Sequence, residues 1–221
     1  MIQMPSPNHD ARGGVPASML VLHYTGMTSA AAALSRLCDP AAKVSAHYTI
    51  DEDGTVYAHV PEDRRAWHAG LAFWGGVRDV NAHSIGIELV NPGHEFGYRN
   101  FASAQIAALK NLCAEILKRH AIPAWNVVGH SDVAPARKDD PGELFPWEEL
   151  ARDGIGLWPK ASTSIVGAEA LLWLGYDPEA LPEKRITAFQ RHFRPGKLTG
   201  LWDEECGHRL AGLLSAKASL S

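Results

Sequence analysis

The chain is poor in cysteine, and its few cysteines form no recognisable pattern. Only Cys38, Cys113 and Cys206 occur among the 221 residues, scattered and odd in number. This usage argues against a disulfide framework and against a cysteine-based metal site, and it is typical of a reducing compartment. Cys113 lies on the apolar side of a predicted helix, where a thiol serves as a small core residue.

Long hydrophobic runs are also missing. No segment approaches the roughly 20 apolar residues that a membrane-spanning helix needs. The first residues, MIQMPSPN, lack the basic start and apolar run of a secretory signal. We therefore expect a protein without a membrane span that stays in the cytoplasm. A periplasmic location is the alternative, if a signal peptide has been removed.

Positive charge is not in excess either. The formal net charge is −4, so no basic stripe is available and nucleic acid is not an expected partner. Hydrophobic residues make up 46% and charged residues 21%, which is ordinary for a globular protein. A chain of 221 residues can form one large or two modest domains with a proper core. The composition does not set the oligomeric state.

The spacing of apolar residues predicts an α/β unit followed by helices. Ile106, Leu109 and Cys113 recur at helical spacing within a helix over 103–120. Asp53 and Gly54 predict the turn of a β-hairpin. Further strands are predicted at 19–24, 84–90 and 125–128, further helices at 30–37 and 147–152, and only short helical patterns at 165–174, 183–192 and 204–214. We therefore divide the chain into an α/β domain over 1–160 and a small helical domain over 161–221.

The loop at 129–142 carries the strongest chemical signal. Its two prolines and two glycines disfavour a regular helix, and His130 stands where a strand ends. His23 ends another buried-type strand, so both imidazoles can converge at one edge of a sheet. With Asp140 they would form a His₂Asp zinc site with an open fourth position. The alternative for each histidine is a hydrogen-bonded structural residue.

Glu88 is the candidate general base. It interrupts the apolar run at 85–90, and a carboxylate in a buried strand is costly unless it is paired or functional. Burial raises the pKa of such a group and a nearby metal lowers it, so it can accept a proton from an attacking water. The alternative is a strand residue that faces solvent.

Five ordered blocks carry a family resemblance. They are LHYT at 22–25, VSAHY at 44–48, AWHAG at 66–70, SIGIE at 84–88 and the loop at 129–142. Together they resemble the zinc-dependent N-acetylmuramoyl-L-alanine amidases, most closely the AmpD/AmiD branch, with SPNH at 6–9 similar to its usual opening. The resemblance spans about residues 5–160 and implies a central mixed β-sheet flanked by helices.

The resemblance also implies the parts of the site. His23, His130 and Asp140 would bind Zn²⁺, Glu88 would be the general base, and Lys138 would stabilise the charge that develops on the carbonyl oxygen. The substrate would be the amide between N-acetylmuramic acid, or its 1,6-anhydro form, and L-alanine, in fragments recycled from the cell wall. Where relatives of this fold carry a catalytic tyrosine the chain has Ala46. Four residues are expected to line the cleft: His47, Trp67, His68 and Asn81.

The tail resembles the three-helix peptidoglycan-binding module. The matching segments are LGYD at 174–177, AFQRHF at 188–193 and GLWDEE at 200–205. Such a module would hold cell-wall fragments near the site and raise their effective concentration. The alternative is a helical cap without a binding role. For the whole chain, the competing functions are a non-catalytic peptidoglycan-recognition protein, a metallohydrolase acting on another amide, and a periplasmic amidase acting on intact wall.

Overall fold

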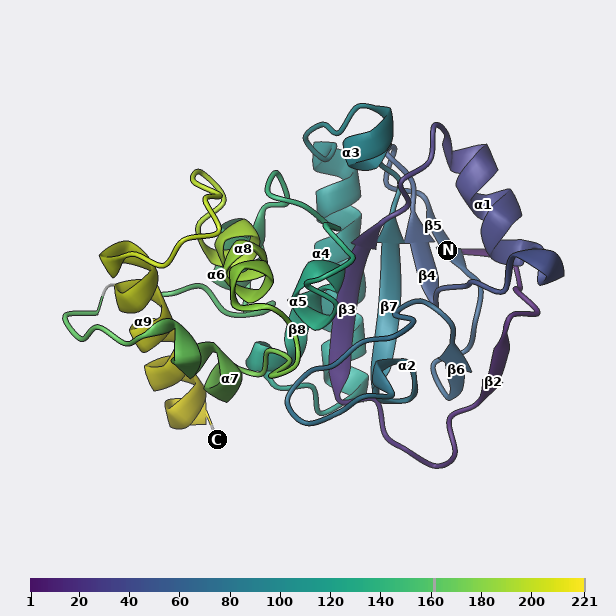
Figure 1. Ribbon diagram of the computed structural model, residues 1–221. Helices are drawn as coiled ribbons and strands as arrows, with labels where there is room; N and C mark the ends of the chain where they lie inside the picture. Colours follow the sequence, from purple (N-terminus) through teal and green to yellow (C-terminus); the bar gives the residue numbers. More distant parts are fainter. Residues whose placement is uncertain (161, 221) are drawn as a thin grey trace.

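A computed structural model describes residues 1–160 and 162–220 and shows a mixed β-sheet between two layers of helices (Figure 1). The six strands lie in the order β1-β5-β4-β7-β3-β8, and only the β4–β5 pair is antiparallel. This confirms the predicted fold class. The strands of the main sheet are β1 (Ile2–Gln3), β3 (Met19–Tyr24), β4 (Tyr48–Ile50), β5 (Val56–Ala58), β7 (Ser84–Leu89) and β8 (Val127–Gly129), and a separate pair is formed by β2 (His9–Ala11) and β6 (Arg64–Ala66).

The register of the central strands decides which side chains share a face. Leu20 and Leu22 of β3 enter one hydrophobic core, while Met19 and Val21 enter the other. This alternation places His23 on the second face. Glu88 is directly opposite His23 in the parallel β3–β7 pairing, so it lies on the same face. The sheet therefore brings a predicted ligand and the predicted base together at the carboxyl end of two adjacent strands.

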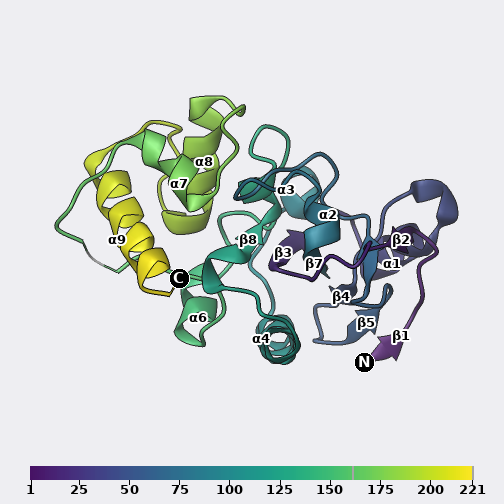
Figure 2. The same cartoon turned by 90° about the horizontal axis from the view of Figure 1, so that it is seen from below.

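Different helices cover the two faces of the sheet. The helix α4 (Ser103–Arg119) packs against one face, with Cys113 fully buried as expected. The other face is covered partly by helices from the end of the chain (Figure 2). These are α7 (Leu171–Leu174), α8 (Pro182–Phe193) and α9 (Glu204–Leu220), after the 3₁₀ helix η3 (Ala168–Ala170). Phe189 and Leu210 share a core with Val21 and Val128 of the sheet.

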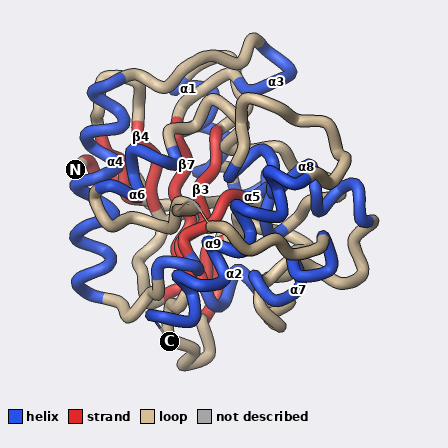
Figure 3. Tube along the Cα trace, turned by 90° about the vertical axis from the view of Figure 1, so that its left-hand side faces the viewer, coloured by secondary structure: helices blue, strands red, loops and turns tan. Residues whose placement is uncertain are grey.

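Shorter helices complete the chain (Figure 3). The predicted helices at 30–37 and 147–152 are present, and the predicted hairpin is confirmed by the β4–β5 pairing. These shorter helices are α1 (Ala30–Cys38), η1 (Pro40–Ala42), α2 (Val80–His83), α3 (Gly93–Phe96), η2 (Ala124–Asn126), α5 (His130–Val133) and α6 (Trp147–Arg152). No helix among the described residues is long and apolar enough to cross a membrane.

Some boundaries differ from the sequence-based expectation. The strand predicted at 125–128 begins only at Val127, because the residues before it form η2. His130 does not lie in an irregular loop; it opens the single helical turn α5, which ends before the proline at 135. The turn ends at Val133 because Pro135 disfavours helical backbone at Ala134, the residue before it. The predicted domain boundary falls at Ala161, which, like Ser221, lies outside the described residues. The division into domains at 160/161 stays a prediction.

Candidate metal and catalytic site

Three predicted ligands converge on one point. The Nδ1 atom of His23 lies 2.9 Å from the Nδ1 atom of His130 and 2.9 Å from Oδ2 of Asp140, and the His130–Asp140 distance is 3.0 Å. All three side chains are buried, and their ligand atoms lie within 4.8 Å of one another. Two imidazole nitrogens and a carboxylate oxygen that face one point form the donor set of a catalytic zinc site.

The second nitrogen of His130 is held by the backbone. His130 Nε2 lies 3.0 Å from the carbonyl oxygen of Ala69. A carbonyl only accepts hydrogen bonds, so Nε2 carries the proton and Nδ1 keeps its lone pair for a metal. The Ala69 backbone is fixed in turn, because Asn81 Oδ1 accepts hydrogen bonds from the amides of His68 and Ala69.

A chain of hydrogen bonds sets the proton on His23 in the same way. The hydroxyl of Ser84 donates to the carbonyl of Val80 at 2.6 Å, so its oxygen accepts from His68 Nε2 at 3.1 Å. His68 Nδ1 is then an acceptor for His23 Nε2, 3.0 Å away. His23 Nδ1 is left without a proton and faces His130 Nδ1 and Asp140 Oδ2. His68 therefore fixes the tautomer of His23, as the Ala69 carbonyl fixes that of His130.

Burial and neighbouring groups tune two of the three ligands. Burial, and next the neighbouring His130, lower the pKa of His23 to about 4, so His23 is neutral at pH 7. Burial by itself would raise the pKa of Asp140, but the neighbouring imidazoles of His130 and His23 hold it well below its usual range. A neutral imidazole and an ionised carboxylate are the forms that bind metal.

Glu88 lies at the edge of this cluster. It lines a cavity of about 60 Å³ together with Thr25, Arg36 and Val44. Its Oε2 atom is buried and has no hydrogen-bond partner among the described residues. Burial and the charge of Asp140 raise the pKa of Glu88 well above its usual value, and Lys138 partly opposes this. Such a carboxylate is suited to exchange a proton.

Of the two adjacent cations of the loop, Arg137 is held by backbone carbonyls. Arg137 donates hydrogen bonds to the carbonyls of Ala69 and Leu71, so its guanidinium is held against the 69–71 segment. Lys138 acts electrostatically on both Glu88 and His23. The charge-stabilising role that the family resemblance implies for Lys138 stays a prediction.

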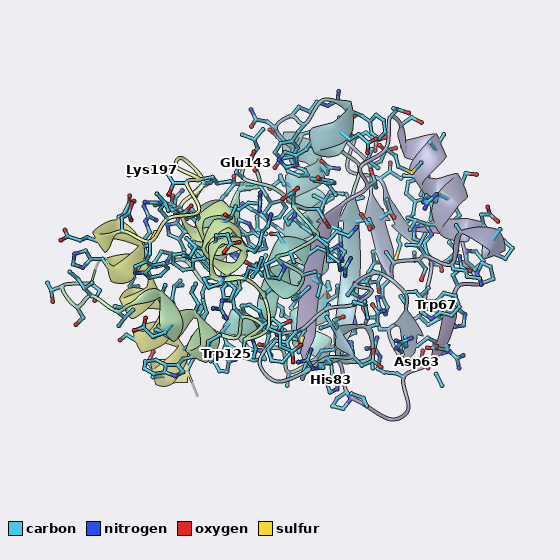
Figure 4. The ribbon with its side chains drawn as sticks, viewed as in Figure 1. Asp63, Trp67, His83, Trp125, Glu143 and Lys197 are labelled. Carbon is cyan, nitrogen blue, oxygen red and sulfur yellow. The ribbon has the colours of Figure 1, made fainter. Side chains whose placement is uncertain are left out.

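Three of the four residues predicted to line the cleft are buried. His47 is fully buried, where it bonds to Arg12 and to the amide of Gly86. His68 and Asn81 are buried behind the metal ligands and hold them. Direct contact of these three residues with substrate stays a prediction. Trp67 is half-buried beside β6, on the side of the sheet away from α8 (Figure 4), and its contact with a sugar stays a prediction.

The sequence reasoning missed Ser84 and Gly86. A Cβ atom built on Gly86 would come within 2.5 Å of the His68 ring, so only glycine leaves room for that ring. A pattern could have revealed both residues. Ser84, Gly86 and Glu88 alternate with isoleucines along one strand, and a period of two places them on one face beside His23.

Comparison with known proteins identifies the family. The profile described as N-acetylmuramoyl-L-alanine amidase matches residues 13–143. The chain belongs to the N-acetylmuramoyl-L-alanine amidase family. It is 40% identical to the amidase AmiD of Escherichia coli, over 85% of this chain and 78% of AmiD. It is 33% identical to the 1,6-anhydro-N-acetylmuramyl-L-alanine amidase AmpD of E. coli, over 66% of this chain and 87% of AmpD.

Solved structures agree. The complex of E. coli AmiD with anhydro-N-acetylmuramic acid-L-Ala-D-γ-Glu-L-Lys superposes with a TM-score of 0.81 at 37% identity, over 96% of this chain and 94% of AmiD. AmpDh3 of Pseudomonas aeruginosa gives a TM-score of 0.83 at 32% identity, over 99% and 100%. The predicted family and enzyme class are confirmed. The non-catalytic alternative is thereby set aside.

Proposed function

We propose that this chain hydrolyses the amide bond between 1,6-anhydro-N-acetylmuramic acid and L-alanine in recycled cell-wall fragments, with one Zn²⁺ held by His23, His130 and Asp140. The observation that carries this proposal is the buried convergence of three ligand atoms within 4.8 Å of one another. The Nε2 atoms of the two histidines, which point away from this site, are hydrogen-bonded to His68 and to the Ala69 carbonyl, as expected of metal ligands.

The chemistry of the donor set fits zinc. Two imidazole nitrogens and one carboxylate oxygen leave a fourth position open, as catalytic zinc sites do. When bound, the ion polarises the scissile carbonyl and lowers the pKa of a water to about 7. The remaining chemistry belongs to the side chains around it.

Glu88 performs the proton transfers in this proposal. Its Oε2 atom is free to accept a proton, because no described residue donates to it. As water attacks the carbonyl, Glu88 takes the proton, and it returns that proton to the departing amine of L-alanine. Lys138, whose charge reaches Glu88 and His23, stabilises the negative charge on the carbonyl oxygen. Ala46 is fully buried and takes no part, so the proton transfers fall to Glu88.

The relatives support the substrate class. E. coli AmiD and P. aeruginosa AmpDh3 have both been solved with anhydro-muramyl peptides. We extend this class of ligand to the present chain and propose the cytoplasm as the place of action. Cleavage of intact wall in the periplasm is the competing function. The helical tail at 161–221, proposed to bind wall fragments, is the feature that favours that alternative.

An assay of two substrates tests the proposal. Purified protein is offered an anhydro-muropeptide and intact sacculi, with and without a chelator, and zinc is counted by elemental analysis. We expect one zinc per chain, chelator-sensitive release of the peptide, and faster turnover of the fragment.

Matched variants separate the roles in this assay. Asp140→Ala is expected to lose zinc and activity together. Glu88→Gln is expected to keep zinc and to lose about 10²–10⁴ in kcat, the usual contribution of general acid–base catalysis. Glu115→Gln, an exposed carboxylate on α4, serves as the control. Full activity of Glu88→Gln, or of the zinc-free protein, would contradict the proposal.

A further inference from the structure

Two consecutive residues of α8 reach the segment that carries two of the metal ligands. Arg191 contacts Asp139, the neighbour of the ligand Asp140, at 2.8 Å. His192 contacts Asp132, two residues after the ligand His130, at 2.7 Å. The helix comes from the end of the chain and lies in contact with α5 (Figure 1). It also lies outside the residues 13–143 that the family profile matches.

The Asp132 contact belongs to a completely buried cluster. Tyr176, which follows α7, donates its hydroxyl to Oδ1 of Asp132 at 2.6 Å, and His192 donates from Nδ1 to Oδ2. The same Oδ2 accepts the backbone amide of Gly129 at 2.8 Å. Burial, and next the negative charge of Asp132, raise the pKa of Tyr176 well above its usual value, so the phenol stays a donor.

This cluster fixes the point where β8 passes into α5. Gly129 is the last residue of β8, and His130 follows it directly. The bond from the Gly129 amide to Asp132 closes that turn, while Tyr176 and His192 hold Asp132 from the other side. The ring of His192 is itself stacked between Trp147 and Phe193, at 3.7 and 3.8 Å between ring centroids. A rigid group therefore stands behind one ligand.

The second contact acts on the other end of the ligand segment. The Arg191 guanidinium pairs with Asp139 and lies 3.5 Å from a carboxylate oxygen of Glu143, so it bridges both flanks of Asp140. Figure 4 shows Glu143 above α8, between that helix and α3. His94 of α3 meets the same carboxylate at 3.2 Å. The segment is thus held from the tail helices and from α3 together.

We infer that α8 is a positioning element of the metal site, acting on His130 through the His192–Asp132 contact and on Asp140 through the Arg191–Asp139 contact. Hydrogen-bonded groups behind metal ligands set their orientation and contribute to metal affinity. The tail helices then complete the zinc site, in addition to any binding of cell wall. This inference rests on the proposed zinc site.

Zinc affinity of the full-length protein tests it. The double variant Tyr176→Phe/His192→Phe removes two hydrogen bonds to Asp132 and keeps both aromatic rings in place. Arg191→Met removes the other contact. Zinc dissociation constants are measured by competition with a chromophoric chelator, beside the visible spectrum of the Co²⁺-substituted protein and the melting temperature of the metal-free form. We expect zinc binding to weaken about 10–100-fold in the double variant, with a changed Co²⁺ spectrum.

The control is the neighbouring residue of the same helix. Gln190 is fully buried, but it bonds to Thr199, Gly200 and Leu201 and touches neither ligand flank. Gln190→Leu is expected to lower the melting temperature and to leave zinc affinity within about twofold of the wild type, because it changes stability without touching the groups behind the ligands.

Each outcome decides the question. Wild-type zinc affinity in the folded double variant and in Arg191→Met overturns the inference, and so does equal weakening in Gln190→Leu. If the double variant does not fold, His192→Phe alone and Arg191→Met give the result. A wild-type protein that binds no zinc overturns the proposed metal site and this inference together; normal wild-type binding with unaffected variants overturns the inference alone.

Discussion

Replacing Gly86 by alanine should disturb the metal site without touching a ligand. A Cβ atom at this position would lie 2.5 Å from Cγ of His68 and 2.6 Å from its Nδ1, where 3.4–4 Å is ordinary contact. The imidazole must therefore retreat by about 1 Å, because the strand backbone of β7 is fixed by neighbours on both sides. His68 Nδ1 is the acceptor for His23 Nε2 at 3.0 Å, so the retreat breaks that bond.

The magnitude follows from two effects. Overpacking a buried site costs about 1–3 kcal/mol of stability. Loss of a group that orients a metal ligand lowers metal affinity about 10–100-fold. We therefore expect Gly86→Ala to fold with a lower melting temperature, to bind zinc at least tenfold more weakly, and to lose kcat/KM for anhydro-muropeptide even at saturating zinc.

The matched control is Gly196→Ala. A Cβ atom there meets nothing within 4 Å, and the backbone is not in the left-handed region. This variant should match the wild type in zinc affinity and turnover. Chelator competition, thermal unfolding and steady-state kinetics measure the three quantities. A folded Gly86→Ala protein with zinc affinity and kcat/KM within twofold of the wild type would refute the reasoning.

Two further predictions concern pH. Lys138 lowers the pKa of Glu88, and Glu88 acts as a base only when it is deprotonated. Lys138→Met should therefore move the acid limb of the kcat/KM profile to higher pH and lower kcat. An acid limb that does not move would contradict this effect of Lys138 on Glu88. Burial lowers the pKa of His47 to about 3, below the unfolded value of 6.5, so the unfolded chain takes up the proton first as pH falls from 6.5 toward 3. The free energy of unfolding of the metal-free protein should therefore fall through that pH window, by up to about 1.4 kcal/mol for each pKa unit crossed. Urea unfolding at pH 7, 6, 5 and 4 measures this free energy. A free energy of unfolding that does not change with pH would contradict the burial of a neutral imidazole.

Much of the fold could be predicted from local patterns. The central strands, the helix at 103–119 and the hairpin turn at Asp53 and Gly54 follow from periodicity and turn chemistry, because these depend on neighbours within a few residues. The single helical turn at His130 was not predicted. Its closure depends on Asp132, whose partners Tyr176 and His192 are 44 and 60 residues away in the chain.

The candidate site divides in the same way. The ligand set His23, His130 and Asp140 was predicted, since strand ends and the loop at 129–142 mark it in the sequence. The supporting role of His68 and Asn81 was not. Both lie in short segments without periodicity, and only packing places their side chains behind the ligands.

The sequence by itself determined which chemical groups the site contains and the strands that bring them to one edge of a sheet. Tertiary structure alone decided how the loop uses its neighbouring charges: Asp132 turns to the tail helices, Asp139 to Arg191 and Asp140 to the metal point. The physical reason is that a single helical turn followed by irregular backbone has no fixed alternation of faces. Each carboxylate therefore points toward whichever distant partner stabilises its charge, and those partners come from α8 as well as from the sheet.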